Sequence, residues 1–336
     1  MTVESGDITA SSQKRVCVYG AAGGVGASAA ASLLARRLPQ HLHLVDVRQE
    51  PLSVLKMDLA LLAQAIGGGE RISDAISPER AREADLVIAA ASVQHRDGTA
   101  RAEFAADNLR ILDSLLDALP QNWSGTLVVA SNPVEVLTTA ARERLGGAAT
   151  VLGYVRNDSL RLAQAIAARL GQPAHRVEAW AAGLHGPGMI GPVGGARLDG
   201  KLVQLTEAEC RSAVAEAVAW YDTWQTFQTG LTSIWTTGYG LAELAGRYYA
   251  EELTEEPVCL PVPCRQPSDL MSFGAPDSAS VCLGVPARIG YGRAEPVADV
   301  FTRTQEQALL ASARGVLALL KSARTVVGVP PPAARG

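Results

Sequence analysis

The chain has 336 residues, of which 48% are hydrophobic and 19% are charged, and its formal net charge is −4. This length suits two domains of a globular protein, and the weak negative charge argues against a nucleic acid partner. No apolar run reaches membrane-spanning length, and the polar first 13 residues lack the features of a signal peptide. We therefore expect a cytoplasmic protein with no membrane partner.

The five cysteines show neither an even number nor CxxC spacing, which argues against a disulfide framework and against a zinc site. They are Cys17, Cys210, Cys259, Cys264 and Cys282. Free thiols that pack as small hydrophobic groups are the expectation, and we predict no metal site.

The first half of the chain alternates strand-like and helix-like segments. Short apolar runs typical of buried strands occupy 15–19, 41–47, 85–91 and 126–131. Helices are predicted between them, over 24–38, over 52–66 and from the loop after residue 91 to about Leu119. This alternation favours an α/β fold with a doubly wound parallel sheet.

The pattern changes after about residue 150. Helices are predicted over 158–170, 206–229, 232–252 and 303–324, and strands over 177–182 and 196–202. Residues 254–280 are rich in Pro and Ser and indicate a loop, and 280–285 with 294–300 suggest an antiparallel pair. We expect a first domain over 14–150, a second α+β domain over 151–326, and disordered tails at 1–13 and 327–336.

A glycine-rich turn follows the first predicted strand and opens the first helix. Its GxxGxxG pattern supplies the candidate cofactor contacts Gly20, Ala21, Gly23, Gly24, Val25 and Gly26. Such a turn brings backbone N–H groups and a helix N-terminus to a pyrophosphate, as in Rossmann domains. Asp46 lies 20 residues after Gly26, near the end of the second strand, where its carboxylate can accept ribose hydroxyls and repel a 2′-phosphate. The sequence therefore predicts NAD, and Arg48 nearby leaves NADP open.

Four further patterns follow in a fixed order. They are SVQHRDGTAR at 92–101, Asn-Pro at 132–133, Asn-Asp-Ser-Leu-Arg at 157–161 and Gly-Leu-His-Gly at 183–186. In this order and spacing the chain resembles the lactate/malate dehydrogenase family, from about residue 15 to the last helix. The resemblance implies a Rossmann NAD-binding domain followed by a catalytic domain, and an enzyme that interconverts a small 2-hydroxy acid and its 2-keto acid. It also implies a homodimer or homotetramer.

The resemblance assigns the acid–base chemistry to three side chains. His185 matches the family's proton-transferring histidine, whose pKa near neutrality lets it act in both directions. Asp158 matches the carboxylate that orients this imidazole. Arg161 matches the arginine that binds the substrate carboxylate, for which a planar guanidinium is suited.

The resemblance also implies contacts around the substrate and the cofactor. Arg101 matches the loop arginine that polarises the keto oxygen in the transition state. Asn132 matches a residue that touches both substrate and nicotinamide ribose, and Asn108 matches a cofactor contact. Thr232 and Ser233 resemble the helix segment that lines the other side of the substrate pocket.

The family's selectivity position, six residues before Arg101, is His95. Members that act on malate carry Arg there and members that act on lactate carry Gln, so His95 matches neither. Because a histidine can be charged and Arg96 is adjacent, we hypothesise a substrate with a second anionic or strongly polar group, either malate/oxaloacetate-like or a specialised acidic keto acid.

Other departures from the family pattern concern residues that shape the pocket. They are Asp97, Asn157, Leu184 and Pro187. A short-chain dehydrogenase would require Tyr-x-x-x-Lys, which the chain lacks. An NAD-binding sensor of the same fold without turnover is the alternative from another class, and it predicts loss of the His, Asp or Arg positions, all of which are present.

Overall fold

The computed structural model describes residues 14–69, 71–93, 99–227, 232–262, 281–297 and 299–328. Within these residues twelve strands form one sheet, in the order β3-β2-β1-β4-β5-β6-β10-β11-β7-β8-β9, with β12 paired to β11. The first six strands run parallel: β1 (Arg15–Tyr19), β2 (His41–Val45), β3 (Arg71–Ala75), β4 (Leu86–Ala89), β5 (Thr126–Val129) and β6 (Thr150–Tyr154). The predicted doubly wound parallel sheet is therefore confirmed.

Strand β1 lies between β2 and β4, so the strand order reverses at this point. Strands β4 and β5 bury every side chain, because helices cover both faces of the sheet. A ligand in such a sheet binds beyond the carboxyl ends of the strands where the order reverses. The turn that follows Tyr19 is therefore at the position expected for a cofactor.

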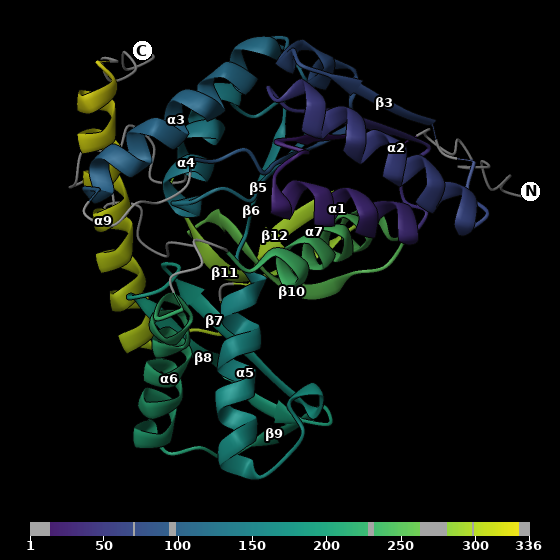
Figure 1. Cartoon of the computed structure of the whole chain (residues 1–336). Helices are drawn as coiled ribbons and strands as arrows, with labels where there is room; N and C mark the ends of the chain where they lie inside the picture. The colour runs from purple at the N-terminus through teal and green to yellow at the C-terminus, as the bar shows by residue number, and fades with distance from the viewer. Residues whose placement is uncertain are drawn as a thin grey trace, which may run out of the picture.

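The helices of this part are α1 (Gly24–Ala35), α2 (Gln49–Ala65), α3 (Arg101–Ala118) and α4 (Val134–Leu145), with a 3₁₀ segment η1 (Pro78–Glu83). Helix α7 (Ile234–Tyr249) packs closely on α1, as Figure 1 shows. A Cβ on Gly238 would lie 2.2 Å from Ser28 Oγ, so only glycine allows this approach. The close packing places the start of α7 beside the glycine-rich turn.

The second lobe contains α5 (Arg156–Leu170), η2 (Ala174–Arg176), β7 (Val177–Gly183), β8 (Met189–Leu198), β9 (Lys201–Val203) and α6 (Glu207–Gln225). It has an apolar core of its own, formed mainly by small side chains of α5, α6 and β7. Strands β10 (Thr254–Pro261) and β11 (Cys282–Gly290) connect this lobe to the parallel sheet, and β12 (Arg293–Pro296) pairs with β11. β10 is antiparallel to β6, and β11 is antiparallel to β7.

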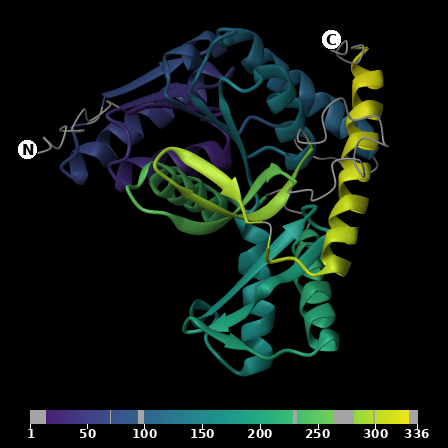
Figure 2. The same cartoon turned by 180° about the vertical axis from the view of Figure 1, so that it is seen from behind.

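Helix α9 (Arg303–Val327) begins at a capping box formed by Thr302 and Gln305. Figures 1 and 2 show it running alongside both lobes, and it packs on α3. An ion pair between Arg324 and Glu143 of α4 joins its second half to the first domain. The last helix therefore stabilises the position of one lobe against the other.

The structure corrects several of the expected elements. Residues 254–280 were expected to be a loop, but β10 occupies their first part and lies in the middle of the sheet. Its sequence TEEPVCLP carries prolines and acids that normally mark loops. They are tolerated because Pro257 lies opposite Pro286, and because Arg156 and Arg247 pair with the buried Glu256.

Strands β3 and β6 and helix α4 were not predicted. The expected strand at 196–202 is two strands, the end of β8 and β9, joined by a turn at Asp199 and Gly200. Val327 is helical and Gly328 is the C-cap of α9, so the predicted start of the disordered tail, at residue 327, is two residues too early. Its remainder and residues 1–13 lie outside the described residues. Among the described residues, no helix is both long enough and apolar enough to cross a membrane.

Candidate active site

The predicted acid–base pair is assembled from two elements. Asp158 lies in the first turn of α5 and is 4% exposed, and His185 lies in the turn after β7. Nδ1 of His185 is 2.8 Å from Oδ2 of Asp158. Gly183 and Gly186 flank the histidine with φ values of +87° and +84°, which a side chain would disfavour. The glycines thus allow the tight turn that brings the imidazole to the carboxylate.

The surroundings of His185 change its pKa in opposite directions. Burial lowers the pKa, but the charge and the hydrogen bond of Asp158, with a smaller contribution from Glu135, raise it above its ordinary value. The contact with Asp158 engages Nδ1, so Nε2 is the nitrogen that can exchange a proton with a ligand. With 32% of its side chain exposed, the imidazole is partly accessible to a ligand.

Arg161 lies one turn further along α5. Its Nη1 donates to Oδ1 of Asp158 at 3.2 Å, and its guanidinium lies 4.4 Å from the ring centroid of Trp220 on α6. Asp158 therefore bridges a histidine and an arginine, and the indole holds the guanidinium plane. Burial lowers the pKa of Arg161 and Asp158 opposes this effect, so that the side chain stays charged.

Sequence reasoning missed Glu135, which is 2% exposed at the start of α4. Its Oε1 accepts a hydrogen bond of 2.6 Å from the backbone N–H of His185. Burial raises the pKa of this carboxyl group. An acidic residue inside the apolar run after Asn132-Pro133 was the available signal, because a buried carboxyl group requires a partner.

Asn157, which departs from the family pattern, has a structural explanation. Its amide donates to Thr237 Oγ1 at 2.8 Å, and its Oδ1 accepts from the hydroxyl group of Tyr154 at 2.9 Å. The bond to Thr237 ties the start of α5, which carries Asp158, to α7, and the bond from Tyr154 ties it to the end of β6. The substitution therefore adds a polar contact between the two helices.

Asn108 on α3 is 1% exposed and connects two predicted parts of the site. Its Nδ2 donates to the backbone carbonyl of Asn132 at 2.9 Å, and its Oδ1 accepts from Val93 N at 2.9 Å and Ser92 Oγ at 3.0 Å. This amide holds the segment after β4 against the segment after β5. Its predicted contact with the cofactor, and that of Asn132, stay predictions.

The glycine-rich turn fits a dinucleotide. A Cβ on Gly20 would lie 2.4 Å from Cα of Ala91, and a Cβ on Gly26 would lie 2.2 Å from the carbonyl oxygen of Gly20. The N-cap of α1 is Gly23, which provides no side chain to cap the helix. The N–H groups of the first turn are therefore available for a phosphate, as a Rossmann domain requires. Ala21 and Val25 lie in the same turn and the start of α1.

Gly24, also in the predicted turn, touches the segment that carries Ser233. A Cβ on Gly24 would lie 2.7 Å from Cδ1 of Ile234, and Ser233 is the N-cap of α7. Thr232 is exposed just before it. Arg101 is exposed at the start of α3. The predicted substrate contacts of Thr232, Ser233 and Arg101 stay predictions. The predicted selectivity residue His95 lies outside the described residues.

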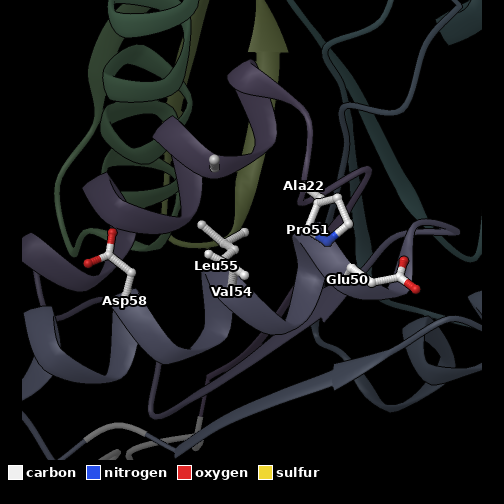
Figure 3. Close-up of a pocket in the computed structure, with 7 residues that line it drawn as sticks. Ala22, Glu50, Pro51, Val54, Leu55 and Asp58 are labelled. Carbon is white, nitrogen blue, oxygen red and sulfur yellow. The ribbon is translucent and has the colours of Figure 1, made fainter.

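A groove of about 500 Å³ lies between α1 and α2 and is shown in Figure 3. Its lining residues are Ala22, Ala27, Glu50, Pro51, Val54, Leu55 and Asp58. Ala22 of the glycine-rich turn forms one end of the groove and Asp58 of α2 lies toward the other. The lining includes neither His185 nor Arg161, so this cavity is separate from the acid–base cluster. Within the described residues, no group of three His, Cys, Asp or Glu could hold a metal ion.

Residues 14–150 match the family model described as lactate/malate dehydrogenase, NAD binding domain. This match, with relatives and similar structures that span nearly the whole chain, supports the lactate/malate dehydrogenase family. It is 27% identical to an L-lactate dehydrogenase from Streptococcus sanguinis over 94% of this chain and 96% of the relative. A malate dehydrogenase from Plasmodium falciparum has a TM-score of 0.81 at 17% identity, with 94% of this chain and 99% of that chain covered.

A minor L-lactate dehydrogenase from Enterococcus mundtii has a TM-score of 0.75 at 21% identity, over 92% of this chain and 98% of that one. The similar structures therefore include both lactate and malate dehydrogenases. The match of residues 14–150 to an NAD-binding domain makes NAD the cofactor, and the similarity to lactate and malate dehydrogenases supports an NAD-dependent hydroxy acid dehydrogenase. The identity to these relatives, about 27%, is too low to fix the substrate.

Proposed function

We propose that the chain is an NAD-dependent dehydrogenase that interconverts a small 2-hydroxy acid and its 2-keto acid. The contact of 2.8 Å between His185 Nδ1 and Asp158 Oδ2, with Arg161 on the same carboxylate, carries this proposal. This arrangement brings together the proton-transferring His185, the carboxylate of Asp158 that orients it, and the guanidinium of Arg161 for a substrate carboxylate.

In the oxidation direction, the guanidinium of Arg161 binds the substrate carboxylate and orients the hydroxyl group toward Nε2 of His185. Nε2 accepts the hydroxyl proton, and Asp158 stabilises the imidazolium that forms. NAD, when bound, supplies the hydride acceptor. In the reverse direction His185 returns the proton to the keto oxygen, which Arg101 polarises.

The substrate we favour carries a second anionic or strongly polar group, as in malate and oxaloacetate or a specialised acidic keto acid. The support is His95 at the family's selectivity position, with Arg96 beside it. A positive charge there would pair with the far end of the substrate, whereas a neutral side chain would suit a methyl group. A neutral His95 would favour a substrate that ends in a methyl group, so the preference for a second anionic group is expected to weaken above about pH 7.

NADH oxidation with a panel of oxaloacetate, pyruvate and bulkier acidic keto acids tests this function. We expect turnover that falls at least about a hundredfold in His185→Asn, while NADH binding measured by fluorescence is retained. Turnover of no keto acid would instead indicate a sensor of the same fold. His95→Gln and His95→Arg, compared over pH with the panel, test the substrate class. Pyruvate as the best substrate, unaffected by His95→Gln, would overturn it.

A further inference from the structure

Asp46, the residue expected to receive the adenosine ribose, already has four hydrogen bonds. Its Oδ2 accepts from Ala22 N at 3.0 Å and from Nη2 of Arg48 at 3.1 Å. Its Oδ1 accepts from the backbone N and the Nε of Arg48, both at 3.0 Å. A carboxylate has about four acceptor positions, so this one is fully occupied. A ribose hydroxyl can therefore donate to Asp46 only after the guanidinium moves.

The other side of the same guanidinium is open. Nε and Nη2 face Asp46, while Nη1 has no hydrogen bond to the described residues, and 53% of the Arg48 side chain is exposed. Nη2 lies 4.0 Å from the position of a Cβ on Gly23, the N-cap of α1. Arg48 therefore covers the edge of the glycine-rich turn and presents unpaired N–H groups beside the ribose position.

We propose that Arg48 makes this cofactor site accept a 2′-phosphate, so that the chain binds NADP(H) as well as NAD(H). An isolated Asp46 carboxylate would repel a 2′-phosphate, but the Arg48–Asp46 pair is neutral as a unit. The outward N–H groups of a guanidinium form short, charge-assisted hydrogen bonds with phosphate oxygens. An arginine near the end of the second strand is the usual means by which Rossmann domains accommodate this phosphate.

The pair does not exclude NAD(H). An ion pair with a half-exposed partner is weak in water, so the guanidinium can leave Asp46 at little cost and a ribose hydroxyl can take its place. The backbone N–H of Arg48 still holds the carboxylate in position after this movement. We therefore expect the chain to bind NAD(H) less than about tenfold more tightly than NADP(H), a smaller difference in affinity than a carboxylate without Arg48 would give.

Calorimetric binding to the chain without keto acid tests the proposal. The probes are NADH and NADPH, with ADP and adenosine 2′,5′-bisphosphate as fragments that lack the nicotinamide. Because no turnover is measured, the result is independent of the dehydrogenase proposal and of its substrate. For the wild type we expect dissociation constants for NADPH and NADH within about tenfold of each other.

Arg48→Ala and Arg48→Gln should weaken NADPH and the 2′,5′-bisphosphate by at least about tenfold and leave NADH and ADP within about threefold. Arg211→Ala, which removes an exposed arginine paired with Glu207 on α6, is the control for loss of one positive charge. It should change none of the four affinities. The proposal is overturned if the wild type binds NADPH more than about tenfold more weakly than NADH, or if the Arg48 variants affect both cofactors equally.

Discussion

Replacing Asp158 by Asn removes the negative charge beside His185 at almost constant volume. In the wild type, one oxygen of the Asp158 carboxylate contacts His185 Nδ1 at 2.8 Å and the other accepts from Arg161 Nη1 at 3.2 Å. An asparagine has one acceptor oxygen, so its NH₂ group must face either the imidazole or the guanidinium. If it faces the imidazole, the neutral ring carries its proton on Nε2, which is the wrong tautomer for accepting a proton there.

The size of the effect follows from the lost charge. Two unit charges about 4 Å apart interact by about 4 kcal/mol at an effective dielectric constant of 20, and one pKa unit corresponds to about 1.4 kcal/mol. Removing this charge should therefore lower the pKa of His185, and because the imidazole is 32% exposed and Glu135 also raises its pKa, the decrease should be smaller than the full charge interaction would give.

The assay is kcat/KM for keto acid reduction at saturating NADH between about pH 5 and pH 9, on either side of the ordinary histidine pKa. Reduction requires protonated His185, so activity falls as pH rises through its pKa. In the wild type this fall lies above about pH 6.5, because Asp158 raises the pKa. In Asp158→Asn it moves to lower pH, and kcat decreases by about 10²- to 10⁴-fold. Hydroxy acid oxidation requires the neutral ring and should show the opposite slope.

Asp199→Asn is the matched control, because Asp199 forms an exposed pair with Arg176 in the same lobe. It should leave both the rate and the pH profile unchanged. If Asp158→Asn kept the wild-type inflection and lost less than about threefold in kcat, Asp158 would not determine the protonation of His185, and the reasoning would be refuted.

Two further changes test neighbouring side chains. Arg161→Lys should raise KM for the keto acid at least about tenfold with a smaller effect on kcat, because a point charge replaces neither the planar fork nor the contact with Trp220; Arg169→Lys on the same helix is the control, and equal KM values in the two variants would contradict the assignment. Glu135→Gln keeps an acceptor for His185 N and removes a buried charge, so the kinetic inflection should move to lower pH by less than in Asp158→Asn. Because burial raises the pKa of Glu135, ionisation of this group lowers the stability of the fold above about pH 4.5. Glu135→Gln should therefore have a higher Tm than the wild type near neutral pH. If its kinetic pH profile were the same as that of the wild type, Glu135 would have no influence on His185.

Local patterns in the sequence were sufficient for β1, the glycine-rich turn and α1, although they missed β3 and α4 in the same half of the chain. The apolar run before Gly20 and the spacing of the glycines predicted the strand, the turn and α1, because these depend on contacts between residues close together in the chain. Asp46, at the end of β2, was identified in the same way. The order of the family motifs also selected His185 and Asp158, although they lie 27 residues apart in the chain.

Only the tertiary structure determined which groups these residues contact. Arg48 bonds with Asp46, Glu135 bonds with the backbone of His185 across 50 residues, and Trp220 packs on Arg161. β10 was missed for a related reason: its prolines and glutamates indicate a loop unless the partners that Pro286 and the arginines supply are known. Hydrophobic periodicity and glycine spacing specify which face of an element is buried, but not which element covers it. That choice depends on strand order and register, which bring distant segments together only when the whole sheet has formed.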